Sequence, residues 1–365
     1  MRLIARLLTL SLPLLFSLPS LAATVSDLYE VREAGASQQP DQRNAELGRA
    51  LDTLVLRLTG KANGSKNPDL AETYKDPQQI VTQYGFEGDS IVVSFDPAST
   101  DRALRQAGLP IWSANRPAVM TWWLNEDING SSLVGDGLAS AEPLNRAAQH
   151  RGLPLRLPLA DLSEQLVGTA ENLSAQSPDE LRSASERYAA DALLAVQASE
   201  NDGAWNADWR LWIGNDDFKG SAQGADQAAV ADSVMMAVSE LLAKRYVAAA
   251  GSSTDLTLEI EGAGLAQYAE IQQLLEPFDS SFSKVDNGRL VFKVKANAEQ
   301  LRSQLALAQL QEVPATADPE PVVVAGEQDS PDSGASADGT GESTAPQPPA
   351  PQSNVPKANV LRFRW

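Results

Sequence analysis

The chain has 365 residues, of which 43% are hydrophobic, so it can bury the cores of about two or three domains. It carries a formal net charge of -19, and an acidic surface of this kind repels nucleic-acid phosphates and anionic lipid headgroups. It has no cysteine, which excludes disulfides, thiol nucleophiles and thiolate metal sites.

The N-terminal segment, residues 1–23, has the pattern of a signal peptide. Arg2 and Arg6 precede an apolar stretch that is interrupted by a proline, and small residues follow it. A helix that spans a bilayer needs about 20 apolar residues, more than this stretch supplies. We therefore expect cleavage after Ala22 or Ala23, export from the cytosol, and a mature protein without a transmembrane segment.

The first expected domain, residues 24–115, follows the order strand, helix, strand, strand, helix. In its first helix four leucines recur at helical spacing and form one apolar stripe, and Gly60 is suited to a left-handed C-terminal cap. The elements are predicted at residues 28–32 (strand), 41–58 (helix), 80–86 and 90–95 (hairpin) and 99–107 (helix).

The central domain, expected at residues 116–250, alternates strands and helices as α/β layers do. Strands are predicted at 118–124, 153–157, 192–198, 205–213 and 218–223, and helices at 138–151, 178–189 and 226–247. Trp205 and Trp209 share one strand face with apolar neighbours, whereas Trp212 lies on the opposite face. We predict that these tryptophans pack in the core and do not stack on sugars.

The third expected domain, residues 252–312, repeats the order of the first. Its elements are predicted at 255–261 (strand), 265–275 (helix), 282–294 (hairpin) and 298–309 (helix), and the Asn-Gly pair at 287–288 favours a type I′ turn.

The chain then changes composition. Residues 313–358, rich in Pro and acidic residues, are expected to form a disordered linker, and the alternation in 359–365 predicts a terminal β-strand that returns to the third domain. The predicted fold class is a multidomain α+β and α/β protein. A central mixed-sheet α/β domain is flanked by two small strand-helix-strand-strand-helix domains, with a disordered acidic Pro-rich insert near the C-terminus.

Few residues are candidates for a site. Asn125, Asp127, Asn129 and Asp136 place oxygen side chains at the spacing of a calcium-binding loop. Because Asp136 stands where that loop has Glu and a strand precedes it, a plain polar loop is the favoured interpretation. His150, the sole histidine, falls near the end of a predicted helix, where we expect a solvent-facing residue and not a general base. We predict no catalytic residue, no cofactor and no bound metal.

Four segments resemble a known family. They are residues 28–31 (Leu-Tyr-Glu-Val), 55–60 (Val-Leu-Arg-Leu-Thr-Gly), 151–162 (Arg-Gly-Leu-Pro-Leu-Arg-Leu-Pro-Leu-Ala-Asp-Leu) and 187–194 (Arg-Tyr-Ala-Ala-Asp-Ala-Leu-Leu). With the spaced Trp205 and Trp209, they resemble the exported proteobacterial family catalogued as domain of unknown function 2066. The central region is also loosely similar to the amino-terminal domain of the Tol-Pal translocation protein.

These resemblances imply a location and no reaction. The first implies the periplasm of the Gram-negative envelope, and the second is to domains that bind partner proteins. We therefore expect a non-catalytic interaction or assembly module with an envelope protein as partner and no nucleic acid. The alternative is a cell-wall glycan hydrolase that uses two carboxylates, or a glycan-binding protein.

Overall fold

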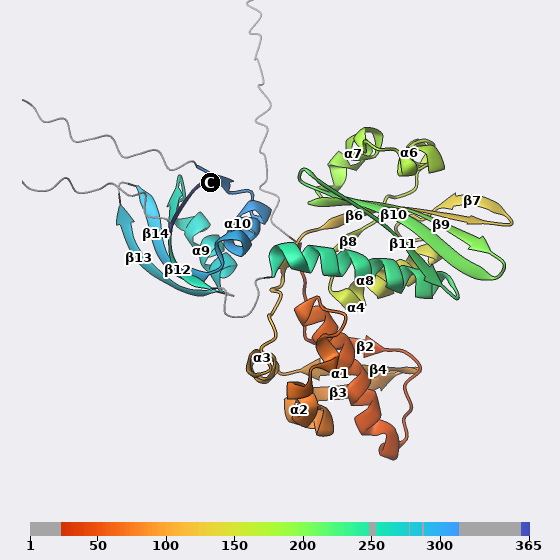
Figure 1. The fold of residues 1–365 in the computed structure, drawn as a ribbon, viewed down its shortest axis with the longest axis horizontal. Helices are drawn as coiled ribbons and strands as arrows, with labels where there is room; N and C mark the ends of the chain where they lie inside the picture. The colour runs from red at the N-terminus through yellow and green to blue at the C-terminus, as the bar shows by residue number, and fades with distance from the viewer. Residues whose placement is uncertain (1–22, 248–252, 277, 287, 314–358) are drawn as a thin grey trace, which may run out of the picture.

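The computed structural model describes residues 23–247, 253–276, 278–286, 288–313 and 359–365. The fold class predicted from the sequence is confirmed: a mixed central sheet is flanked by two smaller α+β units, each with its own hydrophobic core (Figure 1). The expected signal peptide, with Ala22, and nearly all of the expected disordered linker lie outside the described residues. The domain boundaries expected at 115, 250 and 312 remain predictions.

The N-terminal unit packs one long helix against a three-stranded antiparallel sheet of order β2-β4-β3. The leucine stripe of α1 is buried in this core, as its spacing predicts. Gly60 ends α1 with φ +62°, the left-handed cap expected there. The elements are β2 (Glu30–Glu33), α1 (Arg43–Thr59), α2 (Ala71–Lys75), β3 (Val81–Glu87), β4 (Ser90–Phe95) and α3 (Pro97–Gln106).

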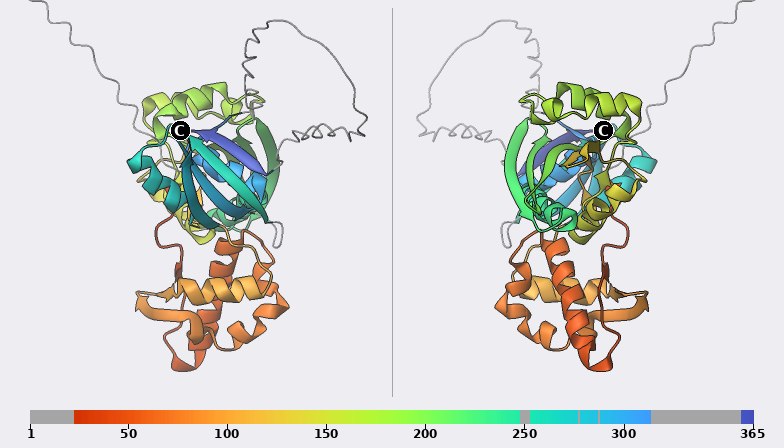
Figure 2. Two further views of the ribbon diagram at one scale, coloured as in Figure 1. Left: turned by 90° about the vertical axis from the view of Figure 1, so that its left-hand side faces the viewer. Right: turned by 90° about the vertical axis from the view of Figure 1, so that its right-hand side faces the viewer.

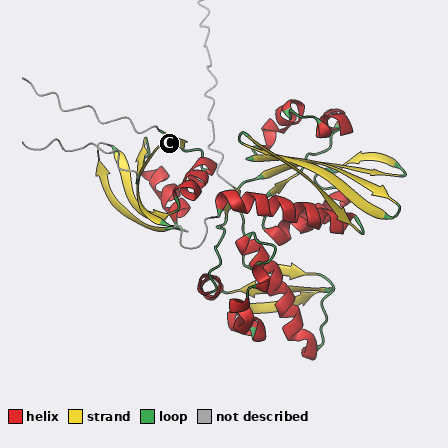
Figure 3. Cartoon of the chain, viewed as in Figure 1, coloured by secondary structure: helices red, strands yellow, loops and turns green. Residues whose placement is uncertain are grey.

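The central unit is a mixed sheet with helices on both faces (Figure 3). Its strand order is β11-β10-β9-β6-β7, with β8 also against β6; β6 runs parallel to β8 and β9, and the other pairs are antiparallel. The strands are β6 (Val119–Asp127), β7 (Gly130–Leu133), β8 (Leu155–Arg156), β9 (Ala192–Asn201), β10 (Ala204–Ile213) and β11 (Asp216–Gly224). The helices are α4 (Glu142–Arg151), α5 (Leu162–Val167), α6 (Ala170–Ser174), α7 (Asp179–Ser185) and α8 (Gln227–Tyr246).

The tryptophans of β10 lie in the two cores of this sheet, as predicted. Trp205 and Trp209 are buried on the face that α4 and α8 cover, and Trp212 is buried on the other face together with Trp122. The ring nitrogen Nε1 of Trp122 donates to the hydroxyl of Ser185 at 2.9 Å, so its polar atom is satisfied inside the core.

The C-terminal unit is a five-stranded sheet of order β13-β14-β12-β16-β15. The predicted terminal strand is present: β16 pairs parallel with β12 and antiparallel with β15. The elements are β12 (Thr254–Glu261), α9 (Leu265–Leu275), β13 (Asp279–Asp286), β14 (Arg289–Ala296), α10 (Ala298–Leu307), β15 (Gln311–Glu312) and β16 (Val360–Arg364). Both small units place their first strand beside the second strand of their hairpin, in the orders β2-β4-β3 and β12-β14-β13.

Two buried arginines join the N-terminal unit, which forms a separate lobe in Figure 2, to the central unit. Arg116 lies in β5 (Asn115–Arg116), which pairs with β1 (Ala23–Thr24). Its guanidinium stacks on Trp112 at 4.3 Å and donates to five backbone oxygens at 2.9–3.2 Å. These belong to Arg57, Trp112, Ser113, Arg151 and Gly152.

The partial negative charge at two helix C-termini balances this buried cation. Arg57 belongs to the last turn of α1, and Arg151 and Gly152 end α4, so the free carbonyls of both helices converge on Arg116. Burial still lowers the pKa of Arg116 to about 9 and that of Arg57 to about 10, values at which both are protonated at neutral pH.

Several elements differ from the sequence-based expectations. Residues 130–133 were expected to be loop and form β7, and the short helices α5 and α6 were not predicted. The helix expected at 178–189 ends as an α-helix at Ser185 and continues as a 3₁₀ turn to Tyr188. Ala189 adopts a left-handed conformation with φ +45°, which ends the turn there.

Candidate functional site

The predicted calcium-binding residues lie on the β6–β7 hairpin. The side-chain oxygen of Asn125 accepts a hydrogen bond from Trp123 Nε1 at 2.7 Å, and a carboxylate oxygen of Asp127 accepts one from the backbone N–H of Asn129 at 2.7 Å. Asp136 follows β7, where its backbone N–H donates to Pro158. The Asp127–Asn129 bond is that of a hairpin turn, whereas Asn125 lies within β6 and Asp136 lies beyond the hairpin. Among the described residues no three His, Asp or Glu side chains are grouped to hold a metal ion. The plain polar loop favoured from the sequence remains a prediction, with calcium binding as its alternative.

The other sequence candidates lie apart from this hairpin. His150 ends α4, and its Nε2 lies 3.2 Å from the backbone oxygen of Arg32 across the joint between units, so it is partly buried and not simply solvent-facing. Ala23, the second residue of the expected cleavage site, begins β1 and pairs with Arg116.

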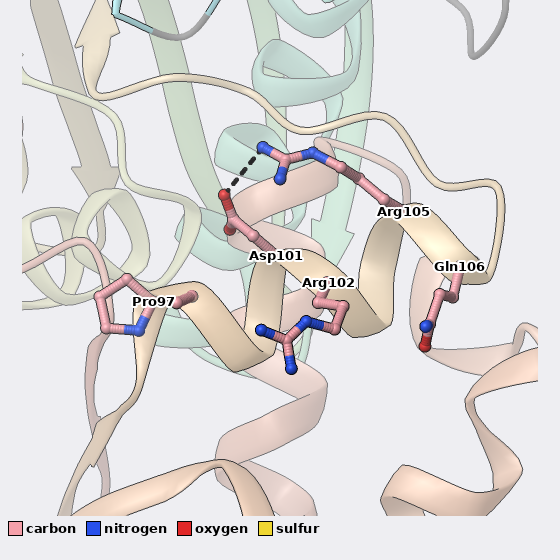
Figure 4. Close-up of a pocket in the computed structure, with 6 residues that line it drawn as sticks. Pro97, Asp101, Arg102, Arg105 and Gln106 are labelled. Atoms are coloured by element: carbon pink, nitrogen blue, oxygen red, sulfur yellow. Dashed lines mark hydrogen bonds and ion pairs between the residues drawn. The ribbon is translucent and has the colours of Figure 1, made fainter.

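Three hollows on the surface of the described residues are candidate sites. One, of about 650 Å³, lies along α3, where Asp101 pairs with Arg105 at 3.2 Å (Figure 4) and accepts from the hydroxyl of Tyr29 at 2.7 Å. A second hollow, of about 520 Å³, lies between α6 and strands β9 to β11, and the carboxylate in its lining is Asp208. Each of these hollows presents a single carboxylate, one fewer than glycan hydrolysis needs.

The third hollow, of about 210 Å³, has two carboxylates in its lining, Glu186 and Asp191. Burial raises the pKa of Asp191, although the backbone N–H of Ala118 donates to it at 2.8 Å. Ligand pockets commonly measure about 300–1,000 Å³, so this hollow is small for a glycan.

Two of the segments that carry the family resemblance, 151–162 and 187–194, meet in the fold. The hydroxyl of Tyr188 donates to Glu164 at 2.6 Å and accepts from the backbone N–H of Leu159 at 2.9 Å. Arg187 forms ion pairs with Glu164 and Asp161, and Arg156 donates to the backbone oxygen of Tyr188. Residues far apart in sequence thus fix the position of α5.

Asp161 fixes the start of α5. It accepts from the hydroxyl of Ser163 at 2.5 Å and from the backbone N–H of Glu164 at 2.9 Å, and Glu164 completes a capping box. These hydrogen bonds, first that of Ser163, together with the Arg187 pair, lower the pKa of Asp161 to about 2. The N-terminus of α5 is therefore well defined despite the helix's short length.

Helix α5, which this network holds, has the reverse of the usual burial pattern. Its Glu164 is 2% exposed, whereas Leu162 and Leu166 are 75% and 72% exposed. These leucines are four residues apart and share one face of α5. A folded chain without a partner would favour the reverse arrangement, because exposing leucine and burying carboxylate both cost free energy.

Two further exposed leucines adjoin α5. Leu138 is 49% exposed and Leu159 is 59% exposed. Their segments touch, because a Cβ placed on Gly135 would lie 3.3 Å from Leu138 Cδ1 and 2.5 Å from the Cβ of Ala160. We call Leu138, Leu159, Leu162 and Leu166 the leucine surface.

The two segments that carry the leucine surface are acidic. Residues 117–145 and 157–181, which contain all four leucines, include no Lys or Arg. Asp136, Glu142 and Glu171 are exposed carboxylates on these segments, and we call them the acidic rim. Arg187, a cation beside α5, is paired with the two carboxylates Asp161 and Glu164. Exposed leucines perform no chemistry, so the leucine surface is a candidate for binding and not for catalysis.

Sequence reasoning did not find this surface. The Asp-x-x-Glu spacing at 161–164 is a readable capping-box signal for α5, and the leucine spacing at 162 and 166 is readable too. What the sequence does not reveal is which side of so short a helix faces the core.

The fold is that of a protein with a central mixed-sheet unit and two smaller α+β units, and the leucine surface lies on the central unit. The model of a domain of unknown function, DUF8605, matches residues 22–113, which is the N-terminal unit. The resemblance to the family catalogued as domain of unknown function 2066 and the similarity to the Tol-Pal translocation protein domain remain predictions.

Two solved structures show a weak similarity to this chain. The C-terminal domain of LpoB from Salmonella enterica is 13% identical, with 30% of this chain and 83% of that domain covered and a TM-score of 0.21. The lipoprotein GNA1162 from Neisseria meningitidis is 16% identical, with 35% and 95% covered and a TM-score of 0.17. TM-scores this low carry no argument about function. No curated protein matches the chain.

Proposed function

We propose that the protein is an exported, non-catalytic interaction module of the bacterial envelope, acting in the periplasm, and that it binds a partner protein through the leucine surface. The observation that carries this proposal is α5, which exposes Leu162 and Leu166 while it buries Glu164. The signal-peptide pattern of residues 1–23 supports export. Within the part of the chain that the structure describes, no helix is both long and apolar enough to cross a membrane.

The leucine surface can supply a useful part of a binding free energy. Full burial of one leucine contributes about 1.5–3 kcal/mol, so four leucines that are half to three-quarters exposed contribute about 4–8 kcal/mol before the cost of association. A micromolar complex needs about 8 kcal/mol. Polar contacts around the leucines must supply the remainder.

Capture from envelope extracts tests the proposal. The full chain is compared with the Leu162→Ser/Leu166→Ser variant and with Leu265→Ser, whose leucine on α9 is 88% exposed but lies in another unit. We expect the wild type and Leu265→Ser to retain the same partner and the double variant to lose it. Equal capture by all three would refute the role of this surface, and cell fractionation that finds the protein in the cytosol would refute export.

One observation favours the alternative of a carboxylate-dependent glycan hydrolase. Glu186 and Asp191 line the same hollow, and burial raises the pKa of Asp191 as a general acid requires. Release of soluble fragments from purified peptidoglycan, abolished in both Glu186→Gln and Asp191→Asn, would establish this alternative. Equal rates with and without the protein would exclude it for this substrate.

A further inference from the structure

We infer that the partner of the leucine surface is a basic amphipathic helix of another protein, with apolar side chains for the leucines and Lys or Arg for the acidic rim. This inference rests on the proposed function and adds the chemistry of the partner. It follows from three properties of the surface: its apolar centre, its charge and its rigidity.

The apolar centre suits a helical partner. Leu162 and Leu166 are one turn of α5 apart, so they present two apolar side chains in a row. The exposed Leu159 precedes this helix by three residues, and the segment that carries Leu138 contacts Ala160. A helix with apolar residues three and four positions apart can insert its side chains between such leucines, as helices do in the grooves of other proteins.

The negative charge near the leucines favours a partner with positively charged residues on either side of its apolar face. Asp136, Glu142 and Glu171 are exposed, and the segments that carry them have no Lys or Arg. Cationic side chains on the partner would lie against these carboxylates and speed association. The same carboxylates repel anionic lipid headgroups, so the charge favours a protein over a lipid surface.

The surface is formed before the partner arrives. Glu164 is held by the hydroxyl of the partly buried Tyr188 and by the half-exposed Arg187, and the capping box fixes the first turn of α5. Little conformational entropy is lost when a preformed surface binds. A short helix that makes its polar contacts inward can therefore present its leucines outward in one geometry.

Three designed helical peptides test this inference with the full chain. One has a leucine face and lysine flanks, the second has the same leucine face with glutamate flanks, and the third keeps the lysines but has serine in place of leucine. Fluorescence anisotropy should show micromolar binding of the first peptide, and binding at least tenfold weaker for the other two, because each lacks one half of the match.

Variants of the protein assign the binding to this surface. Leu162→Ser/Leu166→Ser should weaken binding of the lysine-flanked peptide by at least tenfold. Asp136→Asn/Glu142→Gln/Glu171→Gln should weaken it about three- to tenfold and remove most of its dependence on salt. The matched controls Leu265→Ser and Asp69→Asn/Glu276→Gln change exposed residues in other units and should leave binding unchanged. Far-ultraviolet circular dichroism checks that every variant is folded.

Each contrary result has a distinct meaning. Equal binding of the lysine-flanked and glutamate-flanked peptides, or no effect of the rim substitutions, overturns the basic partner. Binding to anionic phosphatidylglycerol vesicles that depends on Leu162 and Leu166 overturns the protein partner in favour of lipid. If extract capture depends on the leucines while no peptide binds, the proposed function stands and this inference falls. If neither depends on the leucines, both fall.

Discussion

Replacement of Arg116 by methionine should loosen the joint between the N-terminal and central units. Methionine has a similar length and no charge, so it fills the space but leaves five backbone oxygens without their donor. Each hydrogen bond to a charged group contributes about 1.5–3 kcal/mol, which gives at least about 8 kcal/mol for the five bonds. Removing the buried charge offsets several kcal/mol of this loss. The expected net destabilisation is about 3–5 kcal/mol.

Urea unfolding followed by tryptophan fluorescence measures this effect. Trp112, one of the seven tryptophans, stacks on the guanidinium of Arg116, so the emission includes a contribution from the joint. Arg116→Lys keeps the charge but offers only three donors, and it should fall between the wild type and the methionine variant. Limited proteolysis should cut both variants near residues 112–116 faster than the wild type. A methionine variant within about 1 kcal/mol of the wild type would refute the reasoning.

Three further predictions concern single residues. Burial raises the pKa of Asp191, so the contribution of this carboxyl to stability is present below its unfolded pKa of 3.8 and is lost as pH rises through its folded pKa. Urea midpoints between pH 4 and 7 should therefore show the wild type losing stability relative to Asp191→Asn as pH rises. Parallel profiles of the two proteins would contradict this. Gly60→Ala should destabilise the protein by more than about 2 kcal/mol, because φ is +62° and a Cβ there would lie 2.3 Å from the Cβ of Ala243. Gly35→Ala, at φ +64° with open space around it, should destabilise by about 1–2 kcal/mol. Equal thermal shifts of the two variants would argue against the close approach at Gly60. Ser185→Ala leaves the buried ring nitrogen of Trp122 without an acceptor and should lose about 1–3 kcal/mol in urea unfolding, and an unchanged midpoint would show that another acceptor replaces it.

The sequence predicted the long helices and strands whose apolar residues recur with a regular period. The leucines of α1 and the alternation of β10 extend over several turns or residue pairs, so one face is clearly apolar and its burial follows. The terminal strand β16 was predicted from alternation alone, but its parallel pairing with β12 was not, because pairing depends on residues distant in sequence.

Other features depend on contacts between residues that are far apart in the sequence, which a single sequence does not reveal. Arginine is ordinarily exposed, and the burial of Arg116 is compensated by carbonyls of two helix ends that meet only in the fold. Helix α5 reverses the usual rule, since Glu164 is buried and the leucines are exposed, so a pattern search that expects apolar residues inside finds nothing there. The leucine surface therefore becomes apparent only in the folded protein.

Because β15 pairs with β16, residues 314–358 connect two neighbouring strands of one sheet. Val313 donates its backbone N–H to Arg362, and Glu312 pairs with Phe363, so the polypeptide leaves the sheet and re-enters it at adjacent points. The whole stretch is topologically the connection of a hairpin, and a short glycine-rich turn could replace it. A single peptide-bond cut inside it would yield two fragments that stay associated through β16, held by the strands on either side.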